Sequence, residues 1–357
     1  MPKTAKHLWP AVVSFDNLVS AWHQARRGKR YAADVLRFYG KLGENLFNLQ
    51  KQLLGHTWTP APCRLFTVRE PKLRLIQAPY FGDRVVHHAL MDVVSPVFER
   101  RFIHDSYACR DNKGTHAASR RTTEFLRQAT AAWERPWVLK ADISKYFQSI
   151  NHDLLLQRVR RVVSDPDVLW LFERVIRHGG YDECGLPIGA LTSQWLANLY
   201  LDGLDHFVKD DMGVRFYLRY MDDFVLIGPS GDWCRTALGQ ITRFLTCQRL
   251  TLNPKTGIWP ASRGIDFVGY RHWPGHTLPR KRTVKRARRQ FKSLALRYRR
   301  GDIELDYVRP RVVSFTGYMA HCNGYRSLEA ILREFVLVRP GAGAPIPLRC
   351  LRPEKKE

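Results

Sequence analysis

The chain has 357 residues, of which 45% are hydrophobic, and it carries a formal net charge of +25. This length and composition exclude a disordered chain and allow two or three domains with a sizeable buried core. So large a positive charge repels itself unless a polyanion neutralises it, which favours nucleic acid as the partner. The alternatives are an anionic membrane surface, or charge that only keeps the protein from aggregating.

The cysteines and the first residues indicate a cytoplasmic protein. The seven cysteines are an odd number, and none belongs to a C-x-x-C pair, so neither a zinc ribbon nor a disulfide framework is expected. The first ten residues lack the apolar core of a signal peptide, and no apolar run approaches the length of a membrane span.

The first third of the chain predicts helices followed by a hairpin. Residues 14–27 and 31–54 have helical periodicity, with a break allowed at Gly40 and Gly43 in the second. Residues 63–80 then alternate as two strands around a turn at Glu70–Pro71. Residues 83–102 are helical in period.

The middle of the chain predicts a second set of strands and helices. Two helical segments separate the strands. They are residues 153–178 and the part of 185–208 that follows a Gly/Pro loop. The strand-forming segments are residues 137–147, the hairpin 216–228, the end of 232–253 and the short hairpin 264–273.

Residues 280–300 contain eleven basic and no acidic side chains. Val284, Ala287, Phe291, Leu294 and Tyr298 recur there at steps of three and four, which predicts one apolar stripe on a cationic helix. A solvated helix normally mixes both signs of charge, so we expect its free face to lie along phosphates. An ordinary solvated face is the alternative, and residues 339–357 read as a loose Pro/Gly-rich tail.

Three aspartates are candidates for metal-dependent chemistry on phosphate. Asp142 ends a predicted strand, and Asp222–Asp223 are adjacent in a predicted hairpin. Strands disfavour aspartate and neighbouring carboxylates repel, so a divalent cation held between them would explain the pattern. A helix cap or a turn is the alternative for any single aspartate.

Seven segments resemble the motifs of reverse transcriptases, in the order found in that family. YMDD (220–223) resembles the Y-x-D-D box, and ADISKYF (141–147) and GLPIGALTSQWLANLYL (185–201) resemble the first two palm motifs. LNPKTG (252–257) resembles the segment with a lysine after the catalytic hairpin, and GIDFVGY (264–270) the primer grip. Segments 72–90 and 98–118 resemble fingers motifs of the bacterial enzymes.

This resemblance implies an α+β fold of the right-hand polymerase type, with a small antiparallel sheet in the palm and a helical thumb. The implied division is residues 1–135 mainly fingers, 136–272 palm, 273–338 basic thumb and 339–357 tail. The implied activity is RNA-directed DNA synthesis with two Mg²⁺ ions, or Mn²⁺ in their place. The implied partners are template RNA, the RNA/cDNA hybrid and deoxynucleoside triphosphates, with no membrane.

The resemblance also implies roles for individual residues. Asp142 and Asp222 would bind the metal with the Ile143 carbonyl, and Asp223 would be a weaker ligand. Phe147 would stack under the incoming sugar and clash with a 2′-hydroxyl. Lys255 is a candidate general acid, with a surface lysine as the equal alternative. The other expected substrate-binding residues are Lys72, Arg74, Ile188, Gly189, Ser193 and Gln194, and the expected nucleic-acid-binding residues are Arg84, Arg110, Lys113, Gly269, Arg286, Arg289 and Lys292.

Two positions depart from most relatives. Ile188 replaces a glutamine and Gln194 replaces a proline, giving IGALTSQ. This variant resembles the reverse transcriptases of diversity-generating retroelements, which are bacterial or phage-encoded, copy a template RNA with errors at adenines and work with a small basic pentameric accessory protein. The alternatives are a retron-like or defence-associated reverse transcriptase, or a non-catalytic RNA-binding scaffold of the same fold.

Overall fold

The computed structural model describes residues 4–69, 73–178 and 183–339, and the chain folds as two compact units. The first unit takes its residues from Met1–Asn112, Leu139–Leu226 and Arg235–Gly257. The second takes them from Lys113–Val138, Ile227–Cys234 and Ile258–Glu357. Each unit combines segments that are distant in the sequence, so this division does not correspond to continuous fingers, palm and thumb segments. The expected boundaries of fingers, palm and thumb stay a prediction.

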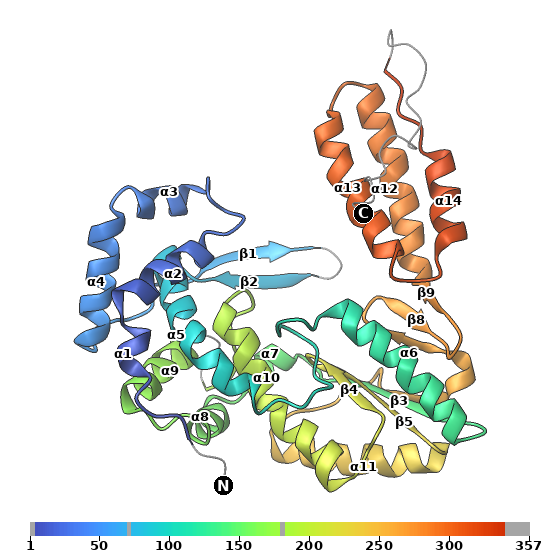
Figure 1. Ribbon diagram of the computed structural model, residues 1–357, viewed down its shortest axis with the longest axis horizontal. Helices are drawn as coiled ribbons and strands as arrows, with labels where there is room; N and C mark the ends of the chain where they lie inside the picture. The colour runs from blue at the N-terminus through green and yellow to red at the C-terminus, as the bar shows by residue number, and fades with distance from the viewer. Residues whose placement is uncertain (1–3, 70–72, 179–182, 340–357) are drawn as a thin grey trace, which may run out of the picture. The chain divides into compact units, whose positions relative to one another are not determined.

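The first unit begins with helices that pack around one central helix (Figure 1). Ser14 caps α2 by accepting a hydrogen bond from the Asn17 amide at 3.2 Å, as the sequence predicted. The second predicted helix is two helices that separate at Gly40 and Lys41. The central helix buries eleven of its residues and contacts each of the other four helices, while Pro96 near its end is exposed. The five helices are α1 (Trp9–Val12), α2 (Phe15–Ala25), α3 (Ala33–Tyr39), α4 (Leu42–Leu54) and the central α5 (Phe81–Glu99).

A two-stranded antiparallel hairpin lies between α4 and α5 in the sequence. It consists of β1 (Arg64–Val68) and β2 (Arg74–Ala78), with Arg64 opposite Ala78 and Val68 opposite Arg74. The predicted turn at Glu70–Pro71, and with it Lys72, lies outside the described residues.

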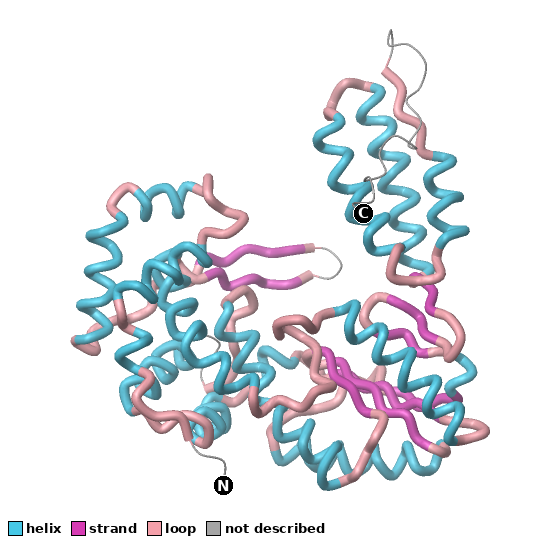
Figure 2. Tube along the Cα trace, viewed as in Figure 1, coloured by secondary structure: helices cyan, strands magenta, loops and turns pink. Residues whose placement is uncertain are grey.

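A four-stranded sheet carries the three candidate aspartates. Its order is β4-β5-β3-β6, and Figure 2 shows the strands side by side in magenta. The β4–β5 pair is antiparallel, with Tyr220 opposite Asp223, which leaves Met221 and Asp222 as a two-residue turn. The strands are β3 (Trp137–Asp142), β4 (Tyr217–Tyr220), β5 (Asp223–Gly228) and β6 (Gly257–Pro260).

The remaining helices of this part of the chain are strongly amphipathic or buried. Helix α10 packs against α5 and α8, and it buries polar residues as well as leucines. It continues directly into a π-helical turn, Phe207–Asp211. The helices are α7 (Tyr146–Ser149), α8 (His152–Arg160), α9 (Pro166–His178), α10 (Leu191–His206) and α11 (Gly231–Cys247).

The second unit combines a small antiparallel sheet with helices. The strands pair in the order β7-β8-β9, and helix α6 contacts β8. The cationic helix predicted from the sequence is α12, and its stripe of Ala287, Phe291, Leu294 and Tyr298 is buried as expected. The elements are α6 (Thr115–Ala132), the 3₁₀ turn Ala261–Arg263, β7 (Ile265–Phe267), β8 (Tyr270–His272), β9 (Thr277–Pro279), α12 (Lys281–Arg299), α13 (Leu305–Met319) and α14 (Tyr325–Glu334).

The mixture of helices with small antiparallel sheets confirms the expected α+β class. Within the described ranges, none of the helices is both long enough and apolar enough to cross a membrane.

We expect Phe291→Ala to destabilise the helical part of the second unit by about 3–4 kcal/mol, because it empties a core site that cannot fully collapse. Phe291 is 3% exposed and its ring lies 5.4 Å from that of Phe315 and 5.0 Å from that of Phe335. Denaturant unfolding measures the loss. Leu296→Ala on the same helix is the control, since Leu296 is 49% exposed and its removal should cost little; equal losses for the two variants would contradict the packing described.

Candidate active site

The YMDD segment forms a strained turn at the end of the β4–β5 hairpin. Met221 has a φ of 58°, in the left-handed region that residues other than glycine rarely adopt. Asp222 follows it at the turn, and Asp223 begins β5. A strained conformation persists only where the surroundings hold it, so contacts must fix Met221 from outside the turn.

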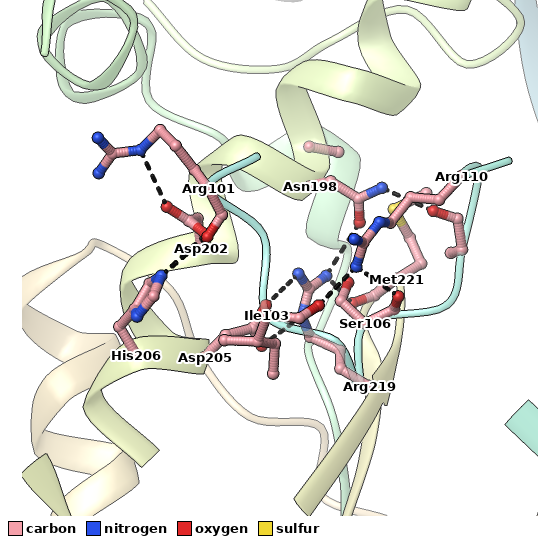
Figure 3. Close-up of polar contacts among 12 residues, drawn as sticks. Arg101, Ile103, Ser106, Arg110, Asn198, Asp202, Asp205, His206, Arg219 and Met221 are labelled. Carbon is pink, nitrogen blue, oxygen red and sulfur yellow. Dashed lines mark hydrogen bonds and ion pairs between the residues drawn. The ribbon is translucent and has the colours of Figure 1, made fainter. Parts of the chain in front are cut away.

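Arg219 provides that contact. Its Nη1 donates a hydrogen bond to the Met221 carbonyl at 2.9 Å (Figure 3). Its Nε and Nη2 donate to the two carboxylate oxygens of Asp205, on α10, at 2.7 and 2.6 Å. Both side chains are fully buried. Burial alone would lower the pKa of Arg219, but the Asp205 carboxylate outweighs it and the pKa is raised, so the guanidinium stays charged.

Neighbouring residues complete the hydrogen bonding of this buried pair. Asp205 also accepts from the Tyr217 hydroxyl at 2.7 Å, and Asn198 accepts from Arg219 Nη1 at 3.1 Å. The Asn198 amide in turn donates to the Ala108 carbonyl at 2.7 Å. Helix α10, strand β4 and the loop before α6 therefore hold the turn together.

Asp142 and Asp222 lie against each other. Their carboxyl groups are close enough to share a hydrogen bond, and the Ile143 amide donates to the Asp222 carbonyl at 3.2 Å. Burial raises the pKa of Asp222, and the charge of Asp142 raises it further. The nearby guanidinium of Arg74, on β2, opposes this rise. The site is therefore short of positive charge.

Asn253 is a site residue that the sequence analysis missed. Its amide nitrogen Nδ2 donates to Asp142 Oδ2 at 3.2 Å, and its backbone amide donates to the Asp142 carbonyl at 2.7 Å. Its Oδ1 accepts from the backbone amide of Lys255 at 3.0 Å. Asn253 thus orients one of the paired carboxylates, and its place in LNPKTG was the available signal.

Asp223 faces a different partner. Its Oδ2 lies 3.1 Å from Nζ of Lys140, while its Oδ1 is buried without a hydrogen-bond partner among the described residues. Burial raises the pKa of Asp223 to about 7, and Lys140 limits the rise. Lys140 was also missed, although it lies two residues before Asp142 on β3 and so on the same face.

These residues fit divalent cations. Within residues 4–69, 73–178 and 183–339, no group of three or more His, Cys, Asp or Glu side chains is arranged to hold a metal ion. Mg²⁺, however, is usually bound through one or two carboxylates and keeps water and substrate oxygens as its other ligands. Two carboxylates that repel each other, and an unpartnered carboxylate oxygen on Asp223, are groups that a cation would satisfy.

The residues expected to contact the nucleotide lie on adjoining segments of the first unit. The Gln77 amide of β2 donates to the Ile188 carbonyl at 3.1 Å, and the Leu186 amide donates to the Phe147 carbonyl at 2.8 Å. Gly189 has a φ of 123°, and a Cβ there would lie 3.1 Å from Ile76 Cγ2. Only glycine fits this conformation without strain.

The other expected substrate-binding residues differ in exposure. Ser193 is 2% exposed within α10, whereas Gln194 is exposed at the next position. Arg74 and Lys255 are exposed. None of these roles in substrate binding is tested, and they stay predictions.

Two of the arginines expected to bind nucleic acid make internal contacts. The Arg110 side chain is 4% exposed and forms a two-pronged ion pair with Glu99, besides donating to the carbonyls of Ile103 and Ser106. Arg84 donates to the Pro79 carbonyl at 3.0 Å. Both therefore fix loops in this structure, and their contacts with nucleic acid stay a prediction.

The expected nucleic-acid-binding residues of the second unit lie near a pocket or on α12. Arg286, Arg289 and Lys292 are exposed on α12, and Lys292 lies 3.8 Å from Glu334. Gly269 follows Val268 in the β7–β8 turn, where both have positive φ, and Lys113 precedes α6. The pocket beside this turn has a volume of about 470 Å³ and contains the stacked rings of His116 and His321. Its lining residues are Thr115, His116, Val268, Tyr270, Ser314, Gly317, Tyr318 and His321.

Comparison with known proteins places residues 68–272, more than half of the chain, within the family model "Reverse transcriptase (RNA-dependent DNA polymerase)". The chain belongs to the reverse transcriptase family. Its right-hand polymerase fold follows from this membership and from the small antiparallel sheets described above.

Individual relatives are distant. Protein YkfC of Escherichia coli is 28% identical over 274 residues, covering 65% of this chain and 72% of YkfC. The group II intron-encoded protein LtrA of Lactococcus lactis is 24% identical over 175 residues, covering 46% of this chain but only 28% of LtrA. A structure of telomerase from Candida albicans aligns with 78% of this chain and 54% of its own, at 12% identity and a TM-score of 0.47.

We expect that removing either member of the buried pair, with Arg219→Met or Asp205→Leu, costs about 3–5 kcal/mol of unfolding free energy, because the remaining charge is left unpaired. The double variant should recover most of this loss, since an apolar pair of similar volume is often neutral. It should still lose primer extension, because nothing then holds the Met221 carbonyl. Denaturant unfolding and primer-extension assays measure the two effects, and a double variant with normal activity would show that the turn does not need Arg219.

Proposed function

We propose that this chain synthesises DNA on an RNA template by two-metal nucleotidyl transfer. The observation that carries the proposal is the contact between the carboxyl groups of Asp142, at the end of β3, and Asp222, in the β4–β5 turn. Paired carboxylates at strand ends are the ligands that Mg²⁺ takes in phosphoryl-transfer sites.

In this reaction the primer 3′-hydroxyl forms a bond to the α-phosphorus of a deoxynucleoside triphosphate, and the bond to the departing pyrophosphate breaks. Asp142 and Asp222 would hold the metal ions with the Ile143 carbonyl, and Asn253 would keep the Asp142 carboxylate oriented. The ions, when bound, stabilise negative charge on the attacking and leaving oxygens. Asp223, paired with Lys140, would act as the weaker ligand.

The chain's other groups would position the substrate. Arg74 lies within electrostatic reach of Asp222, where its charge can pair with the triphosphate. Phe147 would exclude a 2′-hydroxyl from the sugar position. Lys255 would donate a proton to the leaving pyrophosphate, and its backbone is fixed by Asn253.

The sequence of the IGALTSQ segment supports a diversity-generating retroelement as the biological setting. In that setting the enzyme copies a template RNA with errors at adenines, and the cDNA replaces a variable repeat in a target gene. Isoleucine at position 188 cannot form the side-chain hydrogen bond that a glutamine can offer to a nascent pair. Losing such a polar contact weakens discrimination, because a mismatch no longer leaves a hydrogen-bonding group unmet.

A small basic pentameric accessory protein is the partner proposed with this setting, in the cytoplasm of a bacterium. The net charge of +25 supports a shared RNA as the link between the two proteins, since it exceeds what a short duplex neutralises.

We expect Asp222→Asn to reduce primer extension on an RNA template by about a hundredfold or more, because one ligand charge at the reacting phosphate is lost. The rate of deoxynucleotide incorporation measures the effect. Asp302→Asn, at an exposed position, is the matched control and should retain full activity. Equal incorporation by wild type and Asp222→Asn would favour the non-catalytic scaffold instead.

We expect Ile188→Gln to lower the error frequency at template adenines, because it returns a hydrogen-bonding side chain beside the nascent pair. Sequencing of the cDNA measures the change. Ile188→Leu keeps an apolar side chain and should leave the errors unchanged. An unaltered adenine error frequency in Ile188→Gln would rule out this account of infidelity.

A further inference from the structure

A basic and aromatic surface lies on the first unit, on the loop between α2 and α3 and on α3 itself. It is exposed at every one of its six members. It consists of Arg27, Lys29, Arg30, Tyr31, Arg37 and Tyr39, and we refer to it as the α2–α3 surface. No motif or role discussed above includes these residues.

The charge of the α2–α3 surface is uncompensated. From residue 26 to residue 41 the sequence has six basic side chains and one acidic side chain, Asp34. Asp34 lies 3.9 Å from Arg84, outside this segment. Among residues that the structure describes, no ion pair or side-chain hydrogen bond engages the four cations of the surface. A polyanion is therefore the complementary partner.

The two tyrosines add a feature that charge alone does not explain. Tyr31 is 90% exposed and Tyr39 is 56% exposed. Aromatic rings of this size are usually buried or placed where a partner covers them. Two exposed rings interleaved with four cations fit a ligand that offers both phosphates and flat aromatic groups.

The Tyr39 ring is held in place before any ligand arrives. It stacks on Trp22 with a centroid separation of 5.9 Å and an interplanar angle of 5°. The Arg26 guanidinium lies 4.0 Å from the centroid of the Trp22 ring. Because Trp22 is only 4% exposed, the stack is anchored in the core of the unit. A fixed ring loses little conformational entropy when a base packs against it.

We propose that the α2–α3 surface binds single-stranded RNA. Stacking on tyrosine needs bases that are not already paired and stacked in a duplex, which favours a single strand over the hybrid. An acidic peptide would satisfy the cations but not the exposed rings. The choice of RNA over single-stranded DNA rests on the proposed function. In that reaction, the part of the template RNA that has not yet been copied is single-stranded.

The test compares two RNA templates bound by the full chain without nucleotides. The short template ends where the primer duplex ends. The extended template continues as an unpaired strand of about 20 nucleotides, which is longer than the stretch that a single base-stacking site covers. Wild type should bind the extended template more tightly. Tyr31→Ala/Tyr39→Ala should lose about tenfold of affinity for the extended template. It should keep its affinity for the short template.

Salt dependence tests the cations separately. Arg27→Ser/Lys29→Ser/Arg30→Ser should reduce the slope of log affinity against log salt by about two on the extended template, because roughly 0.7 counterion is released per phosphate contact on a single strand. Tyr325→Ala and Arg135→Ser are matched controls at exposed positions, 68% exposed for Tyr325 and 87% for the Arg135 side chain, and should match wild type.

The outcomes separate this proposal from the polymerase assignment. Loss restricted to the extended RNA, with normal primer extension on the short template, supports the α2–α3 surface. Unchanged binding of the extended RNA, equal loss on both templates, or equal loss on a DNA extension of the same sequence would overturn it. Absence of primer extension by wild type on the short template would instead count against the proposed function.

Discussion

The buried ion pair between Arg219 and Asp205 is the interaction on which the site depends. It joins two elements that the chain order separates, since Asp205 belongs to α10 and Arg219 to β4. Burying charges is costly, and it is tolerated here because Arg219 donates four hydrogen bonds and Asp205 accepts three. The same guanidinium that neutralises Asp205 also holds the Met221 carbonyl, directly before the candidate catalytic aspartates.

The carboxylates beyond this pair are arranged in the opposite way. Arg219 and Asp205 balance each other, whereas Asp142 and Asp222 are brought together and the charge of Arg74 only partly offsets the rise in the Asp222 pKa. Burial and the charge of Asp142 raise the pKa of Asp222, as expected of a carboxylate placed to receive a cation. Lys140 and Asn253 occupy one oxygen each on Asp223 and Asp142, so they limit how those side chains turn.

The sequence predicted the parts of this structure that short-range patterns encode. Helical periodicity identified α12 and its buried stripe, and the alternation around YMDD placed the aspartate pair in a hairpin. Long-range polar partners could not be predicted, because nothing in the sequence near Arg219 indicates that its partner lies fourteen residues earlier on α10. The same limit applies to Arg110, whose cationic side chain indicated nucleic acid while its partners, Glu99 and two carbonyls, come from a preceding helix and loop.

The Ile188–Gly189 segment is packed directly against β2. The Ile188 carbonyl accepts a hydrogen bond from the Gln77 amide. Gly189 lies so close to Ile76 that the chain has no room for a side chain at position 189. A shift of the β1–β2 hairpin would therefore move the backbone at Ile188 with it. Under the proposed function, a substitution in β2 would therefore act on the backbone of the proposed nucleotide-binding segment without contacting the nucleotide itself.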